Sequence, residues 1–177
     1  MNSIRRGLNI VFTGDGKGKT TAAFGLALRA AGQRLRVLII QFMKGQSNIG
    51  EIMALEQCHL PIDIKRFGRP GFVQSRACEP LDIYLANEGL SCFRTALLKS
   101  DYEMVVLDEI FVAIDFGLLK DVDLKSTLKL KPPDLHLVLT GRNAPSHMLK
   151  SADIVTEMNE IYHPFSKGMK AQAGIEF

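Results

Sequence analysis

Short apolar runs alternate along the chain with segments whose apolar residues recur at helical spacing. The runs that predict strands are 8–12, 36–42, 62–67, 104–109, 135–140 and 154–161. The segments that predict helices are 20–31, 51–57, 79–98, 111–119, 123–128 and 145–150. Regular alternation of strands and helices is typical of crossover connections, so we expect an α/β fold with a mostly parallel sheet flanked by helices.

The first predicted strand runs into a glycine-rich turn, TGDGKGKTT at residues 13–21, which opens the first predicted helix. Backbone N–H groups of such a loop and of the helix N-terminus converge on one place and bind anions. The turn therefore predicts a nucleoside triphosphate site, with Lys19 as a mobile cation and Thr20 as a ligand of Mg²⁺. Thr13 stands where the common pattern has its first glycine. A glycine-rich hairpin with incidental lysines is the alternative, and the flanking strand and helix argue against it.

Further hydrophilic residues lie at the carboxyl ends of other buried strands, where ligands of open parallel sheets bind. They are residues 41–44, the pair Asp108 and Glu109, and the pair Gly141 and Arg142. The acid pair resembles a Walker B segment and is suited to hold Mg²⁺ directly or through water. Arg142 is suited to pair with phosphate oxygens. The alternative for the acid pair is two solvated carboxylates at a strand end, and the alternative for Arg142 is a surface arginine. Arg29, on the first predicted helix, is equally a phosphate ligand or a cation that interacts favourably with the helix dipole.

The bulk properties narrow the class of protein. The chain has 177 residues, 46% of them hydrophobic, and a net charge of +3, which predicts one soluble domain over residues 1–177 and no nucleic-acid partner. No apolar run approaches the roughly 18 residues of a membrane span. Polar residues 1–6 lead directly into the first strand, so we expect no signal peptide, no membrane and a cytoplasmic location. Cys58, Cys78 and Cys92 are scattered, which predicts reduced thiols and no zinc.

Taken together, these stretches resemble the phosphate-loop type of ATP:corrinoid adenosyltransferase, which acts on cob(I)alamin or cob(I)yrinic acid a,c-diamide. The resemblance rests on residues 13–25, 41–45, 105–109, 140–142 and 163–177. It implies a RecA-like α/β fold, usually as a homodimer, and a place in adenosylcobalamin biosynthesis or salvage. It also implies that Co(I) of a corrinoid attacks the 5′ carbon of ATP and releases triphosphate. ATP would lie reversed in its loop, and a reductant protein would convert Co(II) to Co(I).

The resemblance assigns roles to particular residues. The residues implied to bind ATP are Gly14, Asp15, Gly16, Lys17, Gly18, Lys19, Thr20, Thr21, Arg29 and Arg142. Thr20 and Glu109 are the implied partners of Mg²⁺, with Asp108 as an additional candidate. Lys19 and Arg142 are the catalytic candidates, because they would stabilise the leaving triphosphate. Co(I) is already a strong nucleophile, so we expect no general base, and we expect His163 to cap or pack.

Two departures from the family pattern concern the corrinoid. Family members commonly carry Gly-Phe-x-Trp after the third strand, and here Gly71 and Phe72 are followed by Gln74 at the tryptophan position. Phe72 is the candidate corrinoid contact, with a core anchor for its loop as the alternative. The family's aromatic pair is thought to help the corrinoid lose its lower axial ligand, which eases reduction of Co(II) to Co(I). Because Gln74 replaces the tryptophan, we expect this step to be less favoured here or to be achieved differently. Few residues precede the first strand, so the N-terminal helix that covers the corrinoid in longer members is expected to be missing.

Two other functions remain open from the sequence. A small kinase or ATPase would use the same loop and acids but would release ADP. A non-catalytic nucleotide or nucleic-acid module would rest only on the basic loop at residues 65–76. Identifying the product as triphosphate or ADP separates adenosyl transfer from a kinase or ATPase. An affinity for single-stranded DNA that does not change with salt concentration would exclude the nucleic-acid module.

Overall fold

The computed structural model describes residues 6–45, 49–69, 78–164 and 168–176. Its centre is a six-stranded sheet in the order β3-β2-β4-β5-β1-β6, and every pairing between these strands is parallel. The strands are β1 Asn9–Thr13, β2 Val37–Phe42, β3 Ile62–Phe67, β4 Met104–Asp108, β5 His136–Thr140 and β6 Ile154–Glu157. The predicted α/β class, with a parallel sheet flanked by helices as in RecA-like P-loop proteins, is confirmed.

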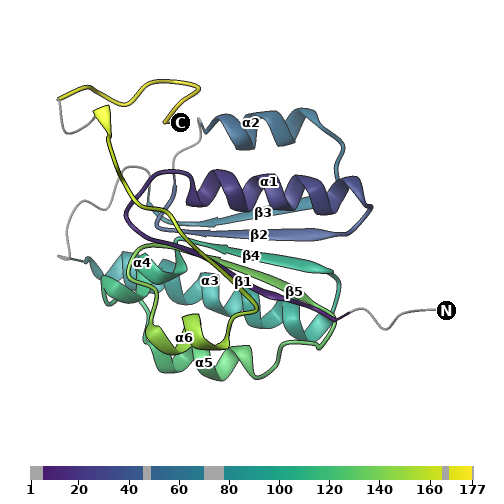
Figure 1. Cartoon of the computed structure of the whole chain (residues 1–177). Helices are drawn as coiled ribbons and strands as arrows, with labels where there is room; N and C mark the ends of the chain where they lie inside the picture. Colours follow the sequence, from purple (N-terminus) through teal and green to yellow (C-terminus); the bar gives the residue numbers. More distant parts are fainter. Residues whose placement is uncertain (1–5, 46–48, 70–77, 165–167, 177) are drawn as a thin grey trace.

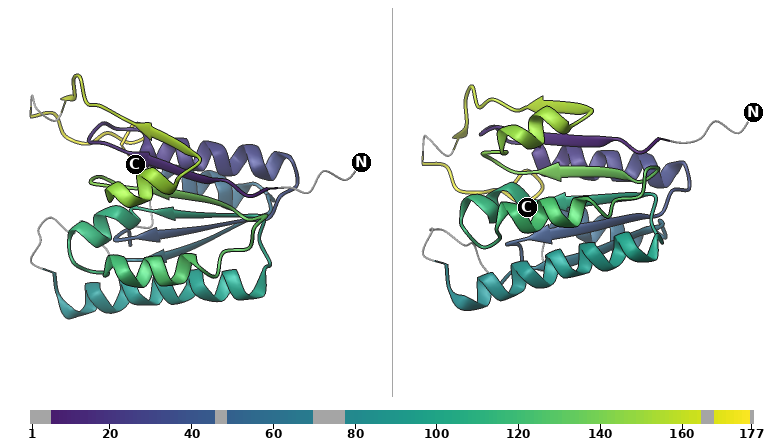
Figure 2. Two further views of the ribbon diagram at one scale, coloured as in Figure 1. Left: turned by 60° about the horizontal axis from the view of Figure 1, so that its bottom comes forward. Right: turned by 90° about the horizontal axis from the view of Figure 1, so that it is seen from below.

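Helices cover both faces of the sheet, which is why the central strands are apolar along their whole length. The helices are α1 Lys19–Gly32, α2 Gly50–Gln57, α3 Pro80–Lys99, α4 Ile110–Asp115, α5 Asp121–Leu128 and α6 Ser146–Ser151. α1 and α2 lie on one face, and α3, α4, α5 and α6 lie on the other (Figures 1 and 2). Alternate residues of the strands contribute to two apolar clusters on opposite faces of the sheet, one packed against α1 and one against α3 to α6.

Two predicted elements are shorter than expected by more than one residue. β6 ends at Glu157 rather than at residue 161, because the next residue, Met158, turns its backbone toward the glycine-rich loop. α4 ends at Asp115, and Gly117, with a φ of 76°, takes the left-handed conformation that commonly ends a helix. No helix among the described residues is long and apolar enough to cross a bilayer.

The carboxyl ends of the parallel strands meet at one edge of the sheet, drawn on the left in Figure 1. The glycine-rich loop joins β1 to α1 at this edge, and the C-terminal segment, coloured yellow, passes over it. β4 lies between β2 and β5, so residues that follow three different strands come together here. This edge is therefore where the predicted site residues are found.

Candidate nucleotide-binding site

The glycine-rich loop is shaped by its contact with the segment after β6. Gly14 and Gly18 have φ values of 92° and 113°, which side chains other than glycine rarely adopt. A Cβ at Gly14 would lie 2.4 Å from the Met158 carbonyl oxygen, and one at Gly16 would lie 2.8 Å from it. The Gly16 N–H donates to that oxygen at 2.7 Å, and the Met158 N–H donates to the Thr13 carbonyl at 2.9 Å. The glycines therefore permit a close backbone approach as well as the turn itself.

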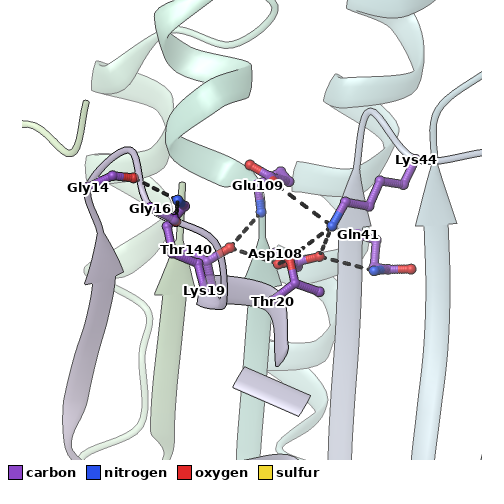
Figure 3. A network of polar contacts seen from close by, with 9 residues as sticks. All are labelled: Gly14, Gly16, Lys19, Thr20, Gln41, Lys44, Asp108, Glu109 and Thr140. Atoms are coloured by element: carbon purple, nitrogen blue, oxygen red, sulfur yellow. Dashed lines mark hydrogen bonds and ion pairs between the residues drawn. The ribbon is translucent and has the colours of Figure 1, made fainter. Parts of the chain in front are cut away.

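Lys19 is folded back into this loop. Its ammonium donates to the carbonyl oxygens of Gly14 at 2.6 Å and Gly16 at 2.7 Å (Figure 3). Burial lowers the pKa of Lys19, although the nearby carboxylate of Glu109 opposes this effect. Lys19 is buried. An anion bound by the loop would therefore meet a poorly solvated cation.

Asp108, the last residue of β4, is fully buried and accepts hydrogen bonds from side chains of other elements. The donors are Thr20 Oγ1 at 3.0 Å, Gln41 Nε2 at 3.0 Å, Lys44 Nζ at 2.8 Å and Thr140 Oγ1 at 2.7 Å (Figure 3). Burial by itself would raise the pKa of Asp108, but the Lys44 charge and these hydrogen bonds outweigh it and hold the pKa below its usual value. Asp108 is therefore an ionised centre that joins α1, β2, β5 and the turn after β2.

Glu109 has a different environment although it follows Asp108 directly. It adopts a left-handed conformation, with a φ of 62°, at the start of α4, and its N–H donates to Thr140 Oγ1 at 2.9 Å. Its side chain is 25% exposed, and one oxygen lies 3.7 Å from Lys44 Nζ. Burial and the neighbouring Asp108 raise the pKa of Glu109, against the effect of Lys44. The turn thus directs one acid into the sheet and leaves the other between the loop and Lys44 (Figure 3).

The loop after β5 docks on the glycine-rich loop. Arg142 Nη2 donates to the Asp15 carbonyl at 3.3 Å, and its Nε lies 3.7 Å from the Asp15 carboxylate. Both side chains are exposed, so this pair is open to rearrangement by a ligand. The Ala144 N–H donates to Thr13 Oγ1 at 3.4 Å. Thr13, the residue that departs from the common pattern, is therefore part of the connection between the two loops.

The C-terminal segment contacts the same loop through charge. Lys17 Nζ lies 2.8 Å from Glu176 Oε2, and the other oxygen of Glu176 lies 3.9 Å from His163 Nε2. The hydrogen bond from Lys17 holds the pKa of Glu176 below its usual value. Sequence reasoning gave no role to Glu176 or Met158, because both reach the loop from far along the chain.

Lys44, Gln41 and Thr140 also lacked an assigned role in the sequence reasoning. The available signal was their position, since all three stand at or just beyond the carboxyl end of a buried strand.

Two candidates on α1 take no part in the contacts described above. Thr21 is exposed on the first turn of α1. Arg29 lies in the last turn of α1, about 14 Å further along the helix axis than Thr20 at 1.5 Å per residue. Phe72 and Gln74 lie outside the described residues. The described ends of their loop are joined by Arg69, which donates to the Asp82 carboxylate at 2.7 and 2.8 Å.

The residues present suit a magnesium ion that arrives with phosphate. No group of three or more His, Cys, Asp or Glu side chains in the described part of the chain could hold a metal by itself. The two acids and the Thr20 hydroxyl supply hard oxygen donors, which Mg²⁺ prefers, and Mg²⁺ commonly completes its shell with water and substrate phosphates.

A parallel sheet with a glycine-rich loop, a loop lysine and strand-end acids at its carboxyl edge defines the class of P-loop nucleotide-binding proteins. Within this class, residues 5–177 match the model of the family described as ATP:corrinoid adenosyltransferase BtuR/CobO/CobP. The chain belongs to this family, as its motifs predicted, and the kinase or ATPase alternative is not favoured.

Curated relatives agree with this assignment. A corrinoid adenosyltransferase of Pseudomonas aeruginosa is 35% identical over 172 residues, which cover 97% of this chain and 84% of the relative. One from Sinorhizobium sp is 37% identical over 175 residues, covering 97% and 81% of the two chains. One from Escherichia coli K12 is 36% identical over 172 residues, covering 97% and 86%. The similarity therefore extends over nearly the whole chain and is not confined to the loop.

Proposed function

We propose that the protein transfers the 5′-deoxyadenosyl group of ATP to the Co(I) centre of a corrinoid and releases triphosphate. The observation that carries the proposal is the family match over residues 5–177 in a chain whose loop, acid pair and Arg142 share one sheet edge. Its place would be adenosylcobalamin biosynthesis or salvage.

The reaction needs charge stabilisation more than proton transfer. The electron pair of Co(I) forms the bond to C5′ while the bond between C5′ and the triphosphate oxygen breaks. The leaving triphosphate takes that bond's electron pair, and cobalt is formally oxidised from Co(I) to Co(III). No proton moves, so the chain needs no general base. Its task is to hold C5′ in line with cobalt and to stabilise charge developing on the leaving group.

The loop residues and two cations are suited to this task. We assign the phosphate cradle to residues 14–20, with Lys19 inside the loop, Arg142 at its tip and Thr21 as a weaker candidate. Thr20 and Glu109 would hold Mg²⁺ directly or through water, and the ion would neutralise phosphate charge. Asp108 already accepts several hydrogen bonds, so we place it in the outer shell, where it orients Thr20 and Lys44. A contact from Arg29 to ATP and one from Phe72 to the corrinoid remain predictions.

The finer assignments are also proposals. We propose one domain over residues 1–177, a homodimer, a separate reductant protein that supplies Co(I), and a cytoplasmic location. Exposed apolar side chains after β6, including Ile161 at 81% and Tyr162 at 91%, support a partner on that side. The three cysteines are free thiols, which supports a reducing compartment.

Product analysis tests the function. The protein is mixed with Mg-ATP and a chemically reduced corrinoid, and the expected products are a light-sensitive cobalt–carbon bond and an equal amount of triphosphate. ADP and phosphate in place of triphosphate would overturn the proposal. Arg142→Met should lower kcat about a hundredfold, because it removes a cation from the leaving group. Arg94→Met is the matched control: it also removes one arginine charge, but on the exposed face of α3 and away from the site. It should leave kcat unchanged.

A further inference from the structure

The ammonium of Lys44 contacts each side chain that the proposed function assigns to the metal site. Its Nζ lies 2.8 Å from Asp108 Oδ2, 2.9 Å from Thr20 Oγ1 and 3.7 Å from Glu109 Oε1 (Figure 3). A cation of the chain itself thus stands among these oxygens.

We propose that Lys44 is an internal substitute for the metal ion, which it replaces until Mg-ATP binds. This inference rests on the Mg-ATP site of the proposed function.

The hydrogen bonds of Thr20 show why the two cations compete. The Thr20 hydroxyl donates to Asp108 Oδ1 at 3.0 Å, and its oxygen accepts from Lys44 Nζ at 2.9 Å. A metal ion would use a lone pair of this same oxygen. It would also stand close to the Lys44 ammonium, where two like charges repel strongly in a partly desolvated site. Lys44 must therefore leave Thr20 before the hydroxyl can bind a metal.

The need for an internal cation follows from burial. Asp108 is fully buried, and Glu109 is only 25% exposed, so two adjacent acids face the same partly enclosed space. The amide of Gln41 and the hydroxyl of Thr140 donate hydrogen bonds to Asp108 but bring no charge. Lys44 supplies that charge. An isolated buried carboxylate is costly, so the nucleotide-free protein would lose stability without it.

The turn that carries Lys44 is fixed, while its side chain is partly exposed. The Met43 N–H donates to the Phe67 carbonyl at 2.9 Å, and Gly45 packs so closely that a Cβ there would lie 2.3 Å from the Arg69 carbonyl oxygen. The Lys44 side chain is 25% exposed, and its flexible stem lets the ammonium swing away from the acids. Triphosphate brings the negative charge that lets a metal ion and the displaced ammonium share this edge. Metal binding should consequently depend on nucleotide.

Binding of Mn²⁺ to the nucleotide-free protein tests this inference. Electron paramagnetic resonance counts free Mn²⁺, which stands in for Mg²⁺, during titration of the wild type, Lys44→Met and Lys99→Met. Lys99 is an exposed residue at the far end of α3, so its variant matches the loss of charge away from the acids. Lys44→Met should bind Mn²⁺ at least about tenfold more tightly than the wild type, because a competing charge is gone. Lys99→Met should bind like the wild type.

A second measurement covers a variant that folds poorly. Millimolar Mn²⁺ should raise the melting temperature of nucleotide-free Lys44→Met more than that of the wild type. If Lys44→Met is insoluble, Lys44→Gln replaces it under the same criteria. Equal Mn²⁺ affinity in the wild type and the Lys44 variant would overturn the inference. This outcome is distinct from failure of the proposed reaction, because the titration uses neither ATP nor corrinoid.

Discussion

Replacing Thr140 with valine would test whether the hydroxyl that joins the two acids stabilises the site. Thr140 is fully buried; its Oγ1 donates to Asp108 Oδ1 at 2.7 Å and accepts the Glu109 N–H at 2.9 Å. Valine has nearly the same shape but makes neither bond. The substitution therefore removes a hydrogen bond to a charged group and leaves a backbone donor without its partner.

The expected cost follows from these contacts. A hydrogen bond to a charged group contributes about 1.5–3 kcal/mol, and an unsatisfied donor costs about 1 kcal/mol more. The added methyl group of valine returns about 0.8 kcal/mol. We therefore expect Thr140→Val to lower the free energy of unfolding by about 2–3 kcal/mol. For a chain of this size the melting temperature should fall by about 4–12 °C.

Urea unfolding followed by circular dichroism measures this loss, with Thr127→Val as the matched control. Thr127 is also buried, but its Oγ1 donates to the Asp123 carbonyl within α5, a bond that adds little to a helix. Thr140→Ser keeps the hydroxyl and should retain most of the stability. A Thr140→Val variant no less stable than Thr127→Val would refute the reasoning.

The loss from Thr140→Val should also depend on pH. The folded-state pKa of Asp108 lies below its usual value, so its contribution to stability is present above the unfolded pKa, near ~3.9, and is lost as the pH falls through the folded pKa. Thr140 is one of the donors that favour the ionised form. The difference in stability between the wild type and Thr140→Val should therefore be complete at neutral pH and shrink in strong acid.

Two further predictions concern the loop and a distant tyrosine. Gly16→Ala should lower the free energy of unfolding by about 1–3 kcal/mol through overpacking against Met158, and calorimetry should show weaker ATP binding. Gly25→Ala is the control and should raise stability, because a Cβ at Gly25 meets open space. Equal effects of the two substitutions on stability would contradict the packing argument. Burial and the hydrogen bond to Asp63 raise the pKa of Tyr102 to about 12, so its contribution to stability is present below the unfolded pKa of ~10 and lost as the pH rises through the folded value. The difference between near-ultraviolet titrations of the wild type and Tyr102→Phe should show this ionisation, and a midpoint at the unfolded value would contradict it.

Local patterns in the sequence were sufficient for the elements and for the edge of the sheet that carries the site. Pro80 marked the start of α3, and the helix runs from Pro80 to Lys99, close to the predicted 79–98. The glycine-rich loop and the acids at the end of β4 were found because strand ends and loops have short-range signatures. The family resemblance rested on the same short motifs, and the match over residues 5–177 confirmed it.

Only the tertiary structure determines which site residue takes which role. Asp108 and Glu109 are adjacent and chemically alike, yet only the register of β4 and the left-handed turn at Glu109 place one in the sheet and the other at the opening. Lys44 reaches Asp108 across 64 positions of sequence because β2 and β4 are neighbours in the sheet. Glu176 reaches Lys17 across 159 positions. Such contacts depend on strand order and on the path of the tail, which no local pattern of hydrophobic and polar residues encodes.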